Sequence, residues 1–299
     1  MSFALSTVEH AGKTLGCIEI DNRFYPLDSF AGGAGLPGDL FTLFGSWDKH
    51  FAALQKAASG CTASGGLARS EVKVLAPLLY PGKVVCAGAN YFDHLAEMGV
   101  ADISKESQRL FFFFKPSRSA VVGHGATVQY PLGSEMFDWE IELAVVIGKH
   151  SRRLTLDNAL DAVAAYTVAI DLSARDFNSA PNTFYKLDWV AGKAQDTSCP
   201  LGPRLVPAAF ITDPHDLALK LSVNGEVKQD ARTSGMVFDI REQLVALSNI
   251  MTLEPGDVVL TGTPAGVGFP KRTFLKTGDR IDAEIETIGA LSVLVGEPG

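Results

Sequence analysis

Two glutamates, Glu140 and Glu142, are the side chains in this sequence best suited to metal chemistry. Residues 141–147 are apolar except for Glu142, which predicts a strand covered on both faces. Side chains two apart in a strand point to the same face, so the two carboxylates would converge. A third acid, Asp171, ends the apolar run 168–170. Three carboxylates form an all-oxygen site, which favours Mg²⁺ or Mn²⁺, and also admits Ca²⁺, over zinc.

The same pair of glutamates has a second interpretation. Exposed faces of strands commonly carry acidic residues at alternate positions. Spacing alone therefore leaves both a buried metal site and a solvated strand face open.

His94 and Glu97 lie three residues apart in residues 91–98, a segment that favours a short helix. On a helix they would be neighbours on one face. A glutamate can hold a histidine in one tautomer and raise its basicity, which yields a general base. An ordinary surface pair has the same spacing.

Lys193 and residues 261–268 are weaker candidates. Lys193 follows a glycine in a loop-like stretch, where it could meet a substrate carboxylate or a developing enolate, although most lysines are only solvated. Residues 261–268 (TGTPAGVG) follow an apolar strand, and small residues there let backbone N–H groups approach an anion. A plain connecting turn is the alternative.

The elements that position these residues are mostly strands. Apolar and alternating runs predict strands at residues 14–20, 83–87, 111–114, 141–147, 257–260 and 280–288, a hairpin turn at Asn224-Gly225, and helices at 47–58, 156–165 and 241–249. The predicted fold class is α+β, because the regular strand–helix alternation of a doubly wound fold is missing.

A run of small residues, 59–66 (SGCTASGG), resembles a linker. We therefore expect a small N-terminal α/β domain at residues 1–70 and a larger domain at residues 71–299.

Charge and hydropathy indicate which partners and which location to expect for this protein. The net charge of −8 argues against nucleic acid as a partner. No apolar run is long enough to span a membrane, and the first residues lack the pattern of a signal peptide, so we expect no membrane partner and a cytoplasmic location. An acidic protein that binds an anion needs local positive charge, from a bound cation or from placed lysines and arginines.

Several stretches match a known family in its order. They are GANYFDH (88–94), FFKP (113–116), WEIELAVVIG (139–148), DLSARD (171–176), GK (192–193), CPLGP (199–203), VNGE (223–226), LEPGD (253–257) and TGTPAGVG (261–268). On these motifs the chain resembles the fumarylacetoacetate hydrolase family, including its acylpyruvases and hydroxyheptadienedioate isomerases.

The resemblance implies a fold and a set of ligands. The fold would be a mixed β-roll, usually dimeric, with a small N-terminal domain. Glu140, Glu142 and Asp171 would bind Mg²⁺ or Mn²⁺. His94 and Glu97 would belong to a lid.

The resemblance also implies substrate contacts. Lys193 would be the active-site lysine, and Arg175, Lys115 and Thr263 would contact substrate. Asn178 would do so too, although family members often have glutamine at its position.

Together with these residues, the resemblance implies a hydrolase that cleaves a C–C bond in an acylpyruvate or related 2,4-diketo acid, giving pyruvate and a carboxylic acid. His94, oriented by Glu97, would deprotonate water, and Lys193 would stabilise the departing enolate. The alternatives are an isomerase or decarboxylase of 2-oxo or 2-hydroxy dienedioates in aromatic catabolism, an oxaloacetate-type decarboxylase, and a binding module without turnover. In each case we expect a small 2-oxo acid as ligand and a homodimer.

Overall fold

The computed structural model describes residues 2–30, 35–59, 65–100 and 104–299. Most of the predicted linker, residues 60–64, lies outside these ranges. None of the described helices is long and apolar enough to cross a membrane.

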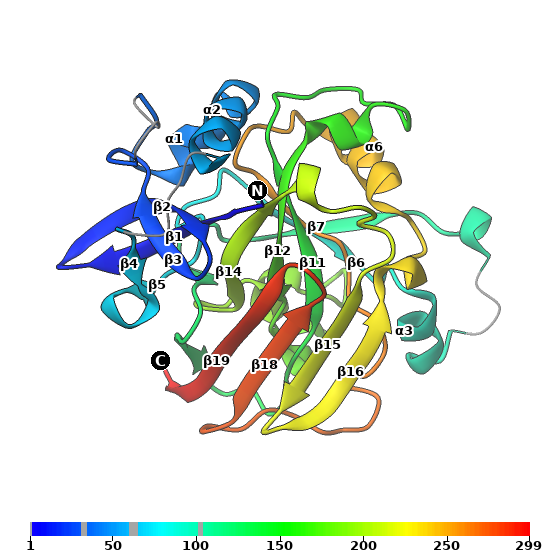
Figure 1. Cartoon of the computed structure of the whole chain (residues 1–299). Helices are drawn as coiled ribbons and strands as arrows, with labels where there is room; N and C mark the ends of the chain where they lie inside the picture. The colour runs from blue at the N-terminus through cyan, green and yellow to red at the C-terminus, as the bar shows by residue number, and fades with distance from the viewer. Residues whose placement is uncertain (1, 31–34, 60–64, 101–103) are drawn as a thin grey trace.

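A 12-stranded mixed sheet runs through the molecule (Figure 1). Its order is β4-β3-β2-β1-β14-β12-β11-β17-β6-β7, with β5 beside β1 and β8 beside β14. Its strands are β1 (Ala4–His10), β2 (Lys13–Ile20), β3 (Arg23–Pro26), β4 (Leu67–Ala68), β5 (Lys73–Val74), β6 (Val84–Gly88), β7 (Phe111–Lys115), β8 (Val121–Val122), β11 (Ile141–Ile147), β12 (Val163–Ile170), β14 (Cys199–Pro207) and β17 (Val258–Leu260).

A five-stranded sheet packs against this one, in the order β16-β15-β18-β19-β9. Figure 1 shows it in front of β11 and β12. Its strands are β9 (Thr127–Tyr130), β15 (Ala218–Val223), β16 (Glu226–Arg232), β18 (Arg280–Ile285) and β19 (Gly289–Pro298). A third, two-stranded sheet pairs β10 (Phe137–Asp138) with β13 (Ser173–Ala174).

Strand β11 lies at the centre of these layers and is buried along its whole length. Ile141 and Leu143 join the core shared with the five-stranded sheet, whereas Ala144 and Val146 join the core on the other face. A continuous apolar run suits a strand covered on both sides. The prediction of a doubly covered strand at residues 141–147 is confirmed.

The helices lie around the sheets, as predicted. They are α1 (Leu40–Phe44), α2 (Trp47–Ser59), α3 (Phe92–Glu97), α4 (Arg175–Asn178), α5 (Trp189–Lys193) and α6 (Ile240–Ile250), with short 3-10 turns at Arg69–Glu71, Lys105–Ser107, Ala159–Ala162, Ala208–Phe210 and Thr233–Gly235.

The predicted helix at residues 156–165 is wrong. A short 3-10 turn, Ala159–Ala162, leads directly into β12, which pairs with β11 on one side and with β14 on the other. Ladder hydrogen bonds on both edges outweigh the weak helical pattern of this alanine-rich segment.

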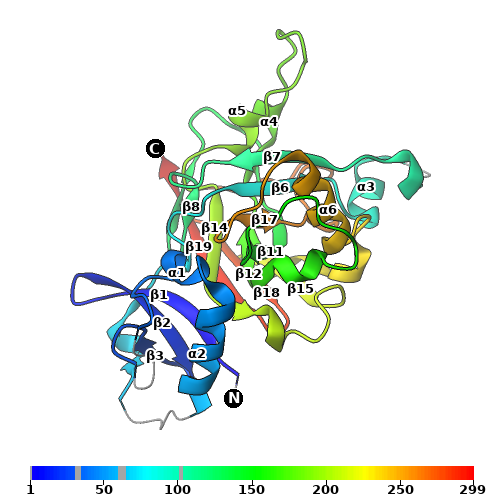
Figure 2. The same cartoon turned by 90° about the horizontal axis from the view of Figure 1, so that it is seen from above.

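The N-terminal strands and helices α1 and α2 gather at one end of the molecule (Figure 2). Strand β1 pairs with β14 through Leu5 and Leu205, so the N-terminal strands extend the large sheet. Side chains of α2, including Trp47 and Leu54, share a core with residues of β11 and β14. The domain boundary at residue 70 stays a prediction.

Candidate active site

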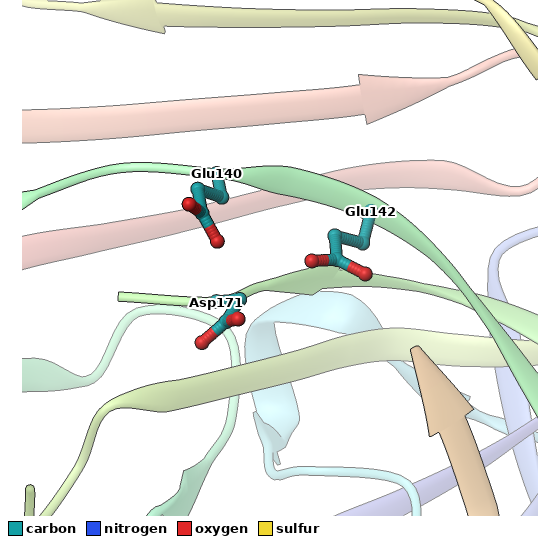
Figure 3. A group of neighbouring side chains, drawn as sticks. All are labelled: Glu140, Glu142 and Asp171. Atoms are coloured by element: carbon teal, nitrogen blue, oxygen red, sulfur yellow. The ribbon is translucent and has the colours of Figure 1, made fainter. Parts of the chain in front are cut away.

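The three acids meet where β11 begins and β12 ends. Glu140 precedes β11, Glu142 is its second residue, and Asp171 follows β12. The strands are antiparallel, with Glu142 opposite Ala169, so the start of one lies beside the end of the other. The three side chains point into one space (Figure 3), and an oxygen from each lies within 4.8 Å of the others. All three are at most 4% exposed, so the solvated strand face is wrong.

Three cations surround two of these carboxylates. Lys193 Nζ lies 2.6 Å from Glu140 Oε2 and 2.7 Å from Asp171 Oδ2. Arg175 pairs with Glu140, and Lys115 Nζ lies 2.8 Å from Asp171 Oδ1. Burial alone would raise the pKa of Glu140, but the charges on Arg175 and Lys193 outweigh it and hold that pKa below its ordinary value.

Glu142 is different, because its carboxylate accepts a hydrogen bond only from a backbone group, the Gly262 N–H, and forms no ion pair within the described part of the chain. Burial, and then the charges of Asp171 and Glu140, raise the pKa of Glu142 well above its ordinary value. A divalent cation between the three carboxylates would supply the missing positive charge. The all-oxygen donor set also matches the hard cations Mg²⁺ and Mn²⁺. The residues present therefore fit a divalent metal ion.

A cavity of about 250 Å³ opens onto these acids. Besides them it is lined by Ala87, Gly88, Ala89, His94, Leu95, Met98, Val100, Phe113, Arg175, Trp189, Lys193 and Thr263. Its polar groups gather on the carboxylate side, whereas much of the remaining wall is apolar.

His94 is buried and its partner Glu97 is partly buried, so the two do not form an ordinary surface pair. Both lie on α3, and His94 Nδ1 is 2.7 Å from Glu97 Oε1. His94 is only 5% exposed, and it lines the cavity. The Gly266 N–H donates to the other oxygen of Glu97 at 2.8 Å, which fixes the carboxylate that holds the ring.

Short helices position the two cations that face the cavity. Arg175 begins α4, and its Nε donates to Asp138 Oδ2 at 2.9 Å. Lys193 ends α5, whose first turn is capped by the side chain of Asp188. The two helices pack closely: a Cβ on Gly192 would lie 1.5 Å from Asn178 Oδ1.

The loop of residues 261–268 binds carboxylates with its backbone. Its N–H groups donate to Glu142, Glu97 and Asp138, from Gly262, Gly266 and Gly268 respectively. The backbone N–H groups of this loop were predicted to bind an anion, and the anions that they bind in the structure are carboxylates of the protein itself. Thr263, from the same loop, lines the cavity and donates its hydroxyl to the Ile141 carbonyl at 2.8 Å.

Two of the predicted substrate residues do not line the cavity. The ammonium of Lys115 is enclosed by Asp171, Ser198 Oγ and the carbonyls of Leu172 and Lys193. These contacts favour a role in holding Asp171. Asn178 packs against Gly192 instead of facing the acids. Substrate contact by either residue stays a prediction.

Two buried residues of the site, Asp138 and Gln229, were not predicted from the sequence. Asp138 accepts hydrogen bonds from Arg175 and from the N–H groups of Trp139, Gly268 and Phe269. Its position two residues before Glu140 was a usable signal, because it continues the same alternation. Gln229 contacts the start of β11 from another sheet, and nothing in its local sequence marks it.

Comparisons with known proteins identify the family of this chain. The model of the fumarylacetoacetate hydrolase C-terminal family matches residues 83–295. A mitochondrial oxaloacetate tautomerase of Bos taurus is 45% identical over 227 residues, which are 75% of this chain and 70% of that protein. The oxaloacetate tautomerase YisK of Bacillus subtilis is 43% identical over 232 residues, which are 76% of this chain and 74% of that protein.

A solved structure extends the likeness to the whole chain. The maleylpyruvate hydrolase of Sphingobium sp., in complex with manganese(II) and pyruvate, has a TM-score of 0.77 at 27% identity and covers 99% of this chain and 100% of its own. The predicted α+β fold with its mixed β-roll is confirmed. With the matched model over residues 83–295 and relatives above 40% identity, this chain belongs to the fumarylacetoacetate hydrolase family.

Proposed function

We propose that this chain is a divalent-metal-dependent tautomerase that interconverts the keto and enol forms of oxaloacetate or a closely related 2-oxo dicarboxylic acid. The observation that carries the proposal is that three convergent carboxylates and His94, which is paired with Glu97, line one small cavity. The relatives named oxaloacetate tautomerases, at 43% and 45% identity, support this choice of reaction.

Glu140, Glu142 and Asp171 would hold the cation, with Mg²⁺ or Mn²⁺ proposed as the natural metal. When bound, a divalent cation polarises a carbonyl oxygen and stabilises negative charge that develops on it. Arg175 and Lys193 add the positive charge that an anionic substrate needs in an acidic protein.

Tautomerisation moves one proton and shifts two electron pairs, with no atom gained or lost. In the keto-to-enol direction the C3–H bond breaks and its electron pair forms the C2–C3 double bond. The C2=O π bond breaks at the same time, and its electron pair binds the proton that the C2 oxygen gains. We assign the proton transfer to His94, whose imidazolium would be stabilised by the Glu97 carboxylate 2.7 Å away. Lys193 would stabilise the negative charge on the C2 oxygen.

C–C hydrolysis, the first choice from sequence, is the second candidate. The His94–Glu97 pair is also suited to activate water, and a structural neighbour that covers 99% of this chain is named a maleylpyruvate hydrolase. In that reaction a hydroxide adds to the distal carbonyl, the adjacent C–C bond breaks, and its electron pair passes to a pyruvate enolate. The more similar relatives favour the isomerase alternative, so we place hydrolysis second.

Parallel assays of the Mn²⁺-loaded protein separate the candidates. The first follows the ultraviolet absorbance of enol-oxaloacetate, and the second follows pyruvate release from acylpyruvates, dienedioates and oxaloacetate. We expect accelerated loss of the enol, absent in Glu142→Gln under the same metal and buffer. Pyruvate release from an acylpyruvate without enol conversion would overturn the tautomerase and favour the hydrolase. Mn²⁺ binding without turnover of any compound would leave a binding module.

We also propose a homodimer, a cytoplasmic location and a domain division near residue 70. All three proposals are based on the sequence. The dimer is tested by light scattering, against a chain mass of 31.9 kDa.

A further inference from the structure

A β-bulge in β16 lies beside the active site. Leu221 of β15 is opposite Gln229, but the next residue, Ser222, is opposite Val227, so Lys228 is an extra residue in β16. Bulges bend a strand and redirect a side chain. Gln229, which follows the bulge, is 1% exposed although Asp230 beside it is exposed.

The side-chain amide of Gln229 extends from the five-stranded sheet to β11, the strand that begins between Glu140 and Glu142. Its Oε1 accepts from the Ile141 N–H at 2.9 Å, and its Nε2 donates to Thr263 Oγ1 and to the Pro264 carbonyl, both at 2.8 Å. Thr263 in turn donates to the Ile141 carbonyl at 2.8 Å. Both backbone polar groups of Ile141 are thus held by this network.

Ile141 is the residue between Glu140 and Glu142. The rotation of its backbone sets the direction and spacing of the two carboxylates, because they project from its two neighbours. A network that holds both its N–H and its C=O therefore restrains the separation of two metal ligands.

The bulge also touches the loop that binds Glu97. A Cβ on Gly266 would lie 2.0 Å from the Lys228 carbonyl, so the loop packs directly on the bulged backbone. The Gly266 N–H donates to Glu97. The same short segment of β16 therefore contacts both β11, which carries Glu142, and the loop that holds Glu97, the partner of His94.

We propose that Gln229 is a positioning residue of the metal site, which sets the spacing of Glu140 and Glu142 by restraining Ile141. This inference rests on the metal site of the proposed function, but not on which reaction the site performs. Gln229 touches no reacting atom, and it acts through Ile141 and Thr263.

The test is the Mn²⁺ affinity of Gln229→Met, measured by electron paramagnetic resonance of free Mn²⁺ and by calorimetry. Methionine keeps the volume of the side chain and removes all three hydrogen bonds. We expect affinity to fall about 10–100-fold, as for lost outer-shell partners of other metal sites. We also expect faster amide exchange at Ile141 in the metal-free variant. If Gln229→Met does not fold, Gln229→Asn, which is too short to reach both partners, should show the same loss.

The control is Leu219→Ala, which removes a buried apolar side chain from the same sheet and leaves the hydrogen bonds that Ile141 forms with Gln229 and Thr263 in place. It should lower the melting temperature and leave Mn²⁺ affinity unchanged. Wild-type affinity in Gln229→Met, or an equal loss in Leu219→Ala, would overturn the positioning role while leaving the proposed function intact. A wild-type protein that fails to bind Mn²⁺ would overturn both.

Discussion

The three carboxylates of the site differ in how many positively charged side chains each one contacts. Glu140 pairs with Arg175 and Lys193, and Asp171 pairs with Lys193 and Lys115. Among the residues that the structure describes, Glu142 accepts a hydrogen bond only from a backbone N–H, although it lies as deep as the others. A bound cation would therefore change the electrostatic environment of Glu142 most, and substitution of this residue would be the most sensitive test of metal binding.

Glu142→Gln should weaken Mn²⁺ binding by at least the roughly 10–100-fold that loss of an outer-shell partner costs. An amide keeps the shape but lacks the negative charge that hard cations prefer. Calorimetry with Mn²⁺ measures the effect, and Glu284→Gln, the same change on an exposed strand position, is the control. Normal Mn²⁺ affinity in Glu142→Gln would show that the metal site is misassigned.

His94→Ala should lower kcat by about 10²–10⁴-fold, the usual contribution of a positioned acid or base. Mn²⁺ affinity should remain, because His94 is not among the clustered acids. The chain offers a matched control in His150, which pairs with Glu254 at 2.9 Å on the surface and should tolerate alanine. Full turnover by His94→Ala would exclude its role as acid or base.

At the scale of elements, the loop of residues 261–268 joins the parts of the site. It contacts Glu142, Glu97 and Asp138 through its N–H groups and packs on the bulge of β16. The close approach requires glycine at position 266, where φ is +105° and a Cβ would meet the Lys228 carbonyl.

Gly266→Ala should therefore destabilise the protein by about 2–5 kcal/mol, the sum of a left-handed backbone cost and a steric clash. Gly278 is the matched control, because its φ is +91° but a Cβ added there would have no atom within 4 Å. Gly278→Ala should cost about 1–2 kcal/mol, the backbone cost alone. Equal unfolding free energies of the two variants in urea would contradict the clash.

At the scale of the whole molecule, two large hydrophobic cores lie on opposite faces of β11 and β12. Hydrogen bonds of a few side chains hold other strands in place. His124, which precedes β9, is one of them, since its Nδ1 accepts from the Ser292 N–H at 3.2 Å. Burial, and then the charges of Arg69 and Arg280, lower the pKa of His124, against an opposing effect of Asp282.

This lowered pKa predicts a pH dependence of stability. The unfolded chain takes up the proton more readily than the folded one, so the contribution of His124 is complete above pH 6.5 and is lost as the pH falls below it. The loss should stay below about 1 kcal/mol, because the ring is half-buried and solvent screens its charge. His124→Asn keeps an acceptor for Ser292 and should flatten the dependence, measured by urea unfolding between pH 5 and 7. An unchanged slope in the variant would contradict this assignment.

Local sequence patterns were sufficient for much of the site. The apolar run of residues 141–147 predicted a strand covered on both faces, and strand geometry then placed Glu140 and Glu142 on one side. Helical spacing likewise brought His94 beside Glu97. These inferences succeeded because the backbone of a single element determines which of its residues are neighbours.

Contacts between distant segments were decided only by the tertiary structure. The pairing of β11 with β12 brings Asp171 to the glutamates, and the enclosed ammonium of Lys115 and the reach of Gln229 across two sheets have no local signal. The misassigned helix at residues 156–165 has the same origin, because strand pairing on both edges overrode its local preference. By itself the sequence determined which side chains share a face. The packing of the sheets, which depends on the whole chain at once, decided which faces meet.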